Sequence, residues 1–235
     1  MARTALVVLG ALALTACKNE PTGEYSGCDP LDPALCALPF PSSSFLAEAD
    51  TPTGYRVAFG PESLPENRDD VRVQPTYLNE KDGFSTMGSM LVYFEDVSVY
   101  GVIGVEDIGA YTAADAKTVI LDAETGERVP HFVEVDQTAE DDAERLLLIR
   151  PVVPMEHATR YIVGIRGLVD NSGAAIEPSH AFAALRDDEK TENYDIEGRR
   201  SHFDDDVFPV LEADWFERSE LQLAWDFVTI SRENS

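Results

Sequence analysis

The chain is poor in basic residues and in long apolar runs, and each shortage excludes a class of function. Its 235 residues contain 18 Lys and Arg against 44 Asp and Glu, which gives a net charge of −26. A field of this sign repels phosphate backbones, so we expect no nucleic-acid partner. The extended apolar run at residues 5–14 is only about half of the roughly 20 residues that a membrane-spanning helix needs.

Sequence patterns for catalysis and cofactor binding are also scarce. The string closest to a nucleophile elbow, residues 83–88, is one residue too long and follows no apolar strand, so we expect Ser85 to be a turn or capping hydroxyl. Phosphate loops and dinucleotide fingerprints are absent from the sequence, and no cofactor is expected. The histidines lie far apart, without the spacing of a metal site. They are His131, His157, His180 and His202.

The N-terminus predicts export from the cytoplasm. Arg3 precedes the short apolar run, which is the order of a secretory signal. The run ends in Leu14-Thr15-Ala16-Cys17, which resembles the lipobox of bacterial lipoproteins. The resemblance implies a signal peptide over residues 1–16 and an acylated Cys17. An ordinary signal peptide with an incidental cysteine is the alternative.

A lipid anchor would place the mature chain on a membrane surface. Residues 17–27 are small and polar, and we expect them to form the lipidated, flexible tether. Lys18 stands where lipoproteins retained at the inner membrane of enteric bacteria have Asp, so the resemblance implies the outer membrane or the cell surface.

The two remaining cysteines predict a disulfide. With Cys17 taken by lipid, Cys28 and Cys36 form a pair in an oxidising compartment. A metal site with two thiolate ligands is the alternative, but no histidine lies nearby to complete it.

Two clusters of acidic residues suggest either a calcium site or a solvated surface. They occupy residues 140–142 and 204–206. Neither has the twelve-residue Asp, Asn and Gly loop with a closing Glu that is typical of calcium sites. We therefore expect a solvated acidic surface and no metal.

Short apolar segments separated by turn residues predict an antiparallel β-sandwich over residues 91–186. Segment 117–122 should pair with 128–135 as a hairpin, because Gly126 in the intervening turn can adopt a positive φ. Without a helical period, this spacing favours a mainly β fold. The other expected strands are 91–94, 145–150 and 160–166.

The segments on either side of the sandwich have different patterns. Prolines and glycines punctuate residues 28–90, which we expect to be irregular and packed on the sandwich, with one edge strand at residues 55–59. Residues 187–235 predict a short helix, kinked or ended by Pro209, and then a buried strand at 221–227.

Several of these segments resemble known bacterial families. Residues 151–176, with PVVP, TRYIV and GLVDNSG, resemble a bacterial Ig-like pattern. Four further elements resemble the N-terminal region of bacterial virulence-factor lipases: LPFPS at 38–42, TGYRV at 53–57, NEKDGFST at 79–86 and LQLAWDFVTIS at 221–231. In that family the last element leads into a catalytic α/β-hydrolase domain, and we expect the present chain to be without it, because no nucleophile elbow is recognised.

The resemblance implies a non-catalytic accessory, spacer or binding module on a membrane, with a surface polymer or another protein as a possible partner. An esterase or glycan hydrolase with an unrecognised site is one alternative, and an adhesin-like binder of a surface polymer is another. Trp215, Phe216 and Trp225 could stack on sugar, although we expect core burial. If the last strand lacks a covering domain, Trp225 and Phe227 would form an exposed apolar patch.

Overall fold

A computed structural model describes residues 28–67, 69–139, 141 and 144–235. The expected signal peptide, the tether and Cys17 lie outside the described residues. The expected mainly β, sandwich-like architecture is confirmed: the chain forms three antiparallel sheets, and short helices precede the C-terminal strand, which belongs to one of these sheets. Within the described residues, no helix is long and apolar enough to span a bilayer.

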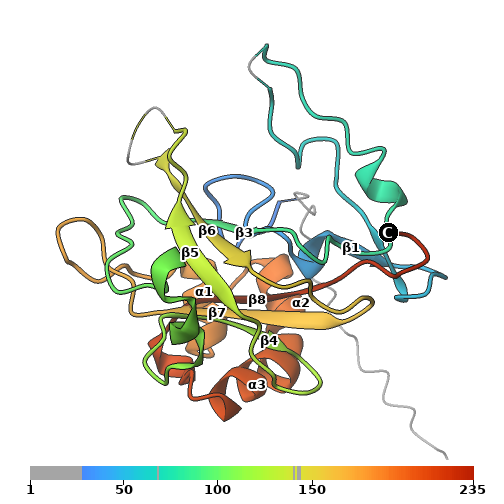
Figure 1. Ribbon diagram of the computed structural model, residues 1–235. Helices are drawn as coiled ribbons and strands as arrows, with labels where there is room; N and C mark the ends of the chain where they lie inside the picture. The colour runs from blue at the N-terminus through green and yellow to red at the C-terminus, as the bar shows by residue number, and fades with distance from the viewer. Residues whose placement is uncertain (1–27, 68, 140, 142–143) are drawn as a thin grey trace, which may run out of the picture.

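One face of the sandwich is a sheet with the strand order β3-β6-β5. These strands are β3 (Met90–Tyr93), β5 (His131–Val135) and β6 (Leu146–Pro151). Burial alternates along β3 and β6, as expected for strands with one face toward a core and one toward solvent. Figure 1 shows this sheet lying over the second one.

The second sheet has the order β4-β7-β8 and is covered on both faces. Its strands are β4 (Thr118–Asp122), β7 (Arg160–Arg166) and β8 (Leu221–Val228). Every residue of β8 is buried, because the first sheet covers one face and the helices cover the other (Figure 1). A Cβ at Gly164 of β7 would lie 2.7 Å from the Leu211 Cδ2, so a larger residue here would require the Leu211 side chain to move.

The predicted hairpin between residues 117–122 and 128–135 is wrong beyond its turn. Gly126 adopts φ +71° as expected, and Val129 N–H still donates to the Ile120 carbonyl at 2.8 Å. Pro130 follows and has no N–H with which to continue the ladder. The chain then crosses to the other sheet, where β5 pairs with β6, while β4 pairs with β7.

The helical segment contains more elements than its sequence pattern predicts. It consists of α1 (His180–Arg186), α2 (Tyr194–His202), a π-helical turn η5 (Phe203–Val207) and α3 (Phe208–Ala213). Pro209 does not end a helix, because it lies in the first turn of α3, where its missing N–H costs nothing. The π-turn interrupts the helix instead. No sequence pattern predicts α1, which is only seven residues long.

The N-terminal segment packs against the sandwich with little regular structure of its own. Its two short strands, β1 (Leu46–Glu48) and β2 (Tyr55–Val57), pair with each other, as the edge strand predicted at residues 55–59 requires. It also contains two short 3-10 helices, η1 (Ser43–Phe45) and η2 (Leu78–Glu80). Two more, η3 (Val105–Thr112) and η6 (Arg218–Glu220), lie in later parts of the chain. One hydrophobic core contains residues from Leu31 to Phe227.

The expectation of an exposed apolar patch at Trp225 and Phe227 is wrong. These side chains are 1% and 0% exposed, because both faces of β8 are covered by other parts of this chain. The Trp225 indole N–H donates to the Pro41 carbonyl at 2.7 Å, and Phe227 stacks on Tyr161 with centroids 5.9 Å apart. The N-terminal segment and β7 therefore contact these two side chains within the chain itself, without a further domain.

Candidate functional site

Four of the segments singled out in the sequence meet around one apolar cavity. Its volume is about 380 Å³, within the range of roughly 300–1,000 Å³ that is typical of ligand pockets. We call it the motif cavity. Its lining comprises Phe40, Val57, Phe59, Leu78, Lys81, Gly83, Phe84, Ser85, Thr86, Ile230 and Ser235. It lies at the end of the molecule where β1 and the last residues of the chain lie near each other (Figure 1).

Contacts between aromatic rings hold the walls of the motif cavity together. Phe84 meets Phe40 edge to face, with centroids 5.6 Å apart, and meets Phe59 in the same way at 6.3 Å. Such geometries are favourable for aromatic pairs and contribute beyond the area that they bury. Segments that are far apart in the sequence are thereby fixed at a common wall.

A glycine allows the segment at residues 79–86 to reach the end of β8. Phe84 N–H donates to the Val228 carbonyl at 2.9 Å, and Ile230 N–H donates to the Phe84 carbonyl at 2.7 Å. A Cβ at Gly83 would lie 2.6 Å from the Thr229 carbonyl carbon and oxygen, closer than real Cβ atoms approach other atoms. The DGFST element therefore attaches this segment to the strand end.

Polar groups are few in the wall of the motif cavity. The Lys81 Nζ donates to the Asn234 carbonyl at 3.0 Å. The Ser85 Oγ accepts the Met87 N–H at 3.2 Å, so Ser85 is a turn hydroxyl, as its sequence context predicts. Of the described residues that line the cavity, none is a histidine.

The four histidines lie in separate places. His131 is buried inside the sandwich, with Nε2 2.9 Å from the Thr118 Oγ1 and Nδ1 2.8 Å from the Val129 carbonyl. Burial lowers its pKa to about 4, and the charge of Arg128 adds to the effect. His157 Nδ1 lies 3.0 Å from the Ile230 carbonyl, and His180 begins α1.

His202 joins the helical layer to the sheet. Its Nε2 lies 3.0 Å from the Oδ2 of Asp226 in β8, and its Nδ1 lies 3.2 Å from the Oδ2 of Asp206. The hydrogen bond to Asp226 raises the pKa of the imidazole, partly opposed by burial and by the Arg160 charge. With a carboxylate at each nitrogen, the protonated ring can donate a hydrogen bond from both nitrogens, which is why its charged form is favoured. His202 and Asp226 are 24 residues apart, so no local sequence pattern predicts this contact.

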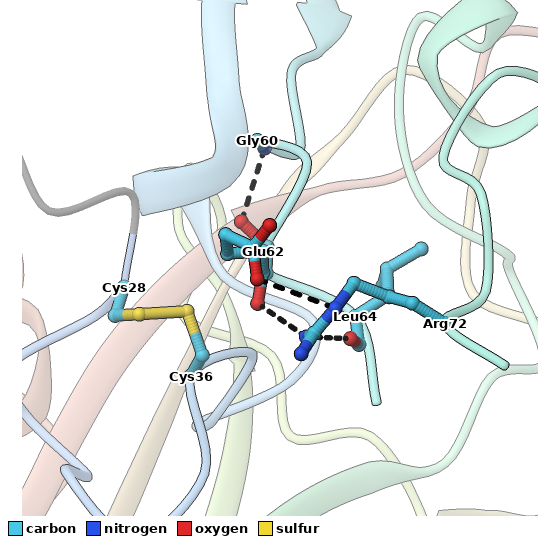
Figure 2. The surroundings of a disulfide bond; sticks show 7 residues. Cys28, Cys36, Gly60, Glu62, Leu64 and Arg72 are labelled. Atoms are coloured by element: carbon cyan, nitrogen blue, oxygen red, sulfur yellow. Dashed lines mark hydrogen bonds and ion pairs between the residues drawn. A yellow bond between two sulfur atoms is a disulfide. The ribbon is translucent and has the colours of Figure 1, made fainter. Parts of the chain in front are cut away.

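The predicted Cys28–Cys36 disulfide is confirmed. Figure 2 shows it with a neighbouring loop in its surroundings, in which Arg72 donates to the carbonyls of Glu62 and Leu64 at 3.1 and 2.9 Å. The bond therefore lies in the N-terminal segment, at the start of the described chain.

The three aromatic residues considered for sugar stacking have different environments. Phe216 and Trp225 are buried in the core, as expected, but Trp215 is 71% exposed. Trp215 follows α3 with φ +69°, and its carbonyl accepts a hydrogen bond from Arg166 at 2.6 Å. The expectation of core burial is therefore wrong for Trp215, because the turn after α3 directs its side chain outward while Phe216 enters the core.

A second, larger hollow of about 690 Å³ is acidic. Burial raises the pKa of Asp32 to about 6. Within the described part of the chain, no group of three or more His, Cys, Asp or Glu side chains is placed to hold a metal ion. The carboxylates of the lining belong to Asp32, Glu95, Asp96, Asp170 and Glu177.

No protein-family model and no curated protein matches this chain. A weak similarity to a solved structure is found. That structure is the N-terminal part of the bacterial S-layer protein SbsC, with 19% sequence identity and a TM-score of 0.28. The match covers 40% of this chain and 19% of the SbsC chain, so it spans about a fifth of that structure. A similarity of this size supports no statement about function.

Proposed function

We propose that this protein is an exported, lipid-anchored surface module that acts by binding and not by catalysis, similar to the N-terminal part of bacterial extracellular lipases. The observation that carries the proposal is the convergence of four sequence elements on the motif cavity. Those elements supply the apolar walls of the cavity, which are typical of a binding site.

The role of Ser85 supports binding over hydrolysis. A nucleophilic serine needs a base within hydrogen-bond reach of its hydroxyl. Here the Ser85 oxygen accepts a backbone N–H and stabilises a turn. His157, which contacts the Ile230 carbonyl through Nδ1, is the histidine associated with this end of β8. Among the described residues, no hydrogen bond joins its ring to the Ser85 hydroxyl.

The catalytic alternative can be tested with a chromogenic ester and the purified full-length chain. We expect no turnover above that of buffer. Ser85→Ala is the informative variant, and Ser43→Ala is its matched control because Ser43 does not line the motif cavity. Turnover that is lost in Ser85→Ala and kept in Ser43→Ala would replace this proposal with an esterase.

The lipid anchor needs its own test, because Cys17 lies outside the described residues. Cells that express the chain are grown with an alkyne-tagged fatty acid, and the isolated protein is examined for the tag. We expect wild type to be labelled and Cys17→Ser to be unlabelled. The double variant Cys28→Ser, Cys36→Ser should keep the label, because its disulfide cysteines are not the acylated ones. Equal labelling of wild type and Cys17→Ser would reject the anchor, and with it the outer-membrane or cell-surface location.

A further inference from the structure

We infer that the motif cavity binds a single aliphatic chain of medium length that ends in a carboxylate. The hydrocarbon would lie against Phe40, Phe59 and Phe84, and the carboxylate would meet Lys81. This inference deepens the proposed function and rests on its claim that the motif cavity is a binding site.

The walls select an apolar occupant. Phe40, Phe59 and Phe84 contribute ring faces and edges, and Val57 and Ile230 contribute branched aliphatic side chains. A volume of about 380 Å³ suits one slender chain better than a polycyclic or two-chain lipid. Transfer of each methylene from water to such a wall is favourable and roughly additive until the space is full.

Exposed apolar side chains are found in the lining of the motif cavity and next to it in the sequence. Leu78 lines the cavity and is 42% exposed, and Tyr77, the preceding residue, is 80% exposed. Met87, which follows the lining residues Ser85 and Thr86, is 50% exposed. Exposed large apolar side chains that are grouped in this way are typical of surfaces that bind apolar ligands.

Lys81 selects the polar end of the ligand. Most arginines of this acidic protein form ion pairs, as Arg128 does with Asp214. Among the described residues, by contrast, the Lys81 ammonium forms no ion pair and donates to the neutral Asn234 carbonyl. An ammonium has three hydrogens to donate, so a carboxylate oxygen can be added. The Lys81 carbonyl accepts the Val57 N–H at 2.8 Å, which fixes its backbone beside the wall.

The net charge of the chain limits the ligand to a single negative charge. A net charge of −26 opposes any anion at long range. At physiological ionic strength this repulsion is screened beyond about 8 Å, whereas a contact with Lys81 acts at hydrogen-bond distance. The binding of a monocarboxylate is therefore weakened less by repulsion from the net negative charge than the binding of a phosphate dianion, which favours a carboxylate head.

Calorimetry with the full chain carrying Cys17→Ser, so that no acyl group is attached, tests the inference. Hexanoate, octanoate and decanoate are titrated below their micellar concentrations at physiological salt, beside the matching alcohols. We expect the affinity to rise about 4-fold per added methylene until the cavity is full. Each carboxylate should bind about 10-fold more tightly than its alcohol, as expected for a hydrogen bond to a charged group.

Variants at Lys81 test the polar end. Lys81→Met should abolish the preference for carboxylate over alcohol while alcohols still bind, and Lys81→Arg should keep the preference. Lys117→Met is the matched control, because the Lys117 Nζ also donates to a backbone carbonyl, that of Tyr100, at 2.9 Å. A preference that survives in Lys81→Met would overturn the assignment of the head group.

Filling the cavity tests the apolar part. Ser85→Trp places a bulky side chain at the wall and should abolish binding of carboxylates and alcohols alike, whereas Val99→Trp, at an exposed residue outside the lining, should not. Circular dichroism of each variant verifies folding. Absence of chain-length dependence, or normal binding by a folded Ser85→Trp variant, would overturn the inference. Either result leaves the lipid anchor untouched, because labelling of Cys17 is measured separately.

Discussion

His202 at the end of α2 and Asp226 in β8 form a direct link between the helices and the sheet, with the imidazole Nε2 3.0 Å from the carboxylate Oδ2. The Asp226 side chain is 7% exposed and His202 is 36% exposed. Arg160 from β7 forms an ion pair with the Asp226 carboxylate, and Asp206 from η5 contacts the His202 ring. The link therefore connects four elements around one titratable ring, and its strength must depend on pH.

We predict that His202 stabilises the fold more at pH 6 than at pH 8. The pKa of its ring is raised in the folded state, so stabilisation is full below the unfolded pKa of about 6.5 and is lost as pH rises through the folded value. Replacement by glutamine should lower the melting temperature by about 2 °C more at pH 6 than at pH 8, because solvent screens a partly exposed pair. An equal loss at both pH values, measured by calorimetry, would contradict the raised pKa.

The buried His131 should behave in the opposite way. Its folded pKa of about 4 lies below the unfolded value, so the unfolded state binds the proton first and stability is lost as pH falls from about 6.5 toward 4. The Val129 carbonyl can only accept, so Nδ1 carries the proton and Nε2 accepts from Thr118. Nuclear magnetic resonance should show this neutral tautomer unchanged down to about pH 5. Titration of the ring near pH 6.5 would be incompatible with its burial.

Two glycines should respond to alanine with opposite signs. At Gly83 the new Cβ would meet the Thr229 backbone at 2.6 Å, which cannot move aside as a flexible side chain can. We expect Gly83→Ala to reduce the free energy of unfolding by about 2–3 kcal/mol. Gly198 lies inside α2 with nothing within 4 Å, so Gly198→Ala should increase it by about 0.5–1 kcal/mol. Urea denaturation of both variants measures the difference, and a neutral Gly83→Ala would disprove the close approach.

The ion pair between Arg199 and Asp29 should be the costlier one to break. The Asp29 side chain is 0% exposed, its Oδ1 lies 2.7 Å from the Arg199 Nη1, and its Oδ2 accepts from the Ser42 hydroxyl. Arg199→Met leaves a buried carboxylate without its cation and should cost about 3–5 kcal/mol. Arg150→Met, which breaks an exposed pair with Glu134, is the control and should cost at most about 1 kcal/mol. Similar losses in the free energy of unfolding in the two variants would show that the buried charge of Asp29 is stabilised by groups other than Arg199.

Some features of this protein can be read from short stretches of sequence. The strand at residues 160–166 and the last strand have short apolar runs bounded by turn residues, and both are strands in the structure. The positive φ of Gly126 follows from the composition of its turn. The Cys28–Cys36 bond depends on two residues that are close in sequence. In each case the deciding interactions extend over a few residues.

Other features depend on contacts between residues that are far apart. Strand Thr118–Asp122 pairs with β7 and not with β5. The residues of the expected hairpin contain no signal that β7 is the preferred partner. Trp225 is covered by the segment around Pro41, which is 184 residues away. The pair His202 and Asp226 is equally invisible to local spacing, because α2 and β8 meet only when the helices pack on the sheet.

The sequence by itself therefore determined the mainly β class, the disulfide and the positions of most strands, since these depend on periodicity and turn chemistry over a few residues. Only the tertiary structure decided which strands pair, how β8 is covered and that the DGFST element joins Phe40 and Ile230 around one cavity. The physical reason is that hydrophobic burial is not directional. Many arrangements of the same apolar segments bury similar areas, and close contacts such as that of Gly83 with Thr229 select one of them.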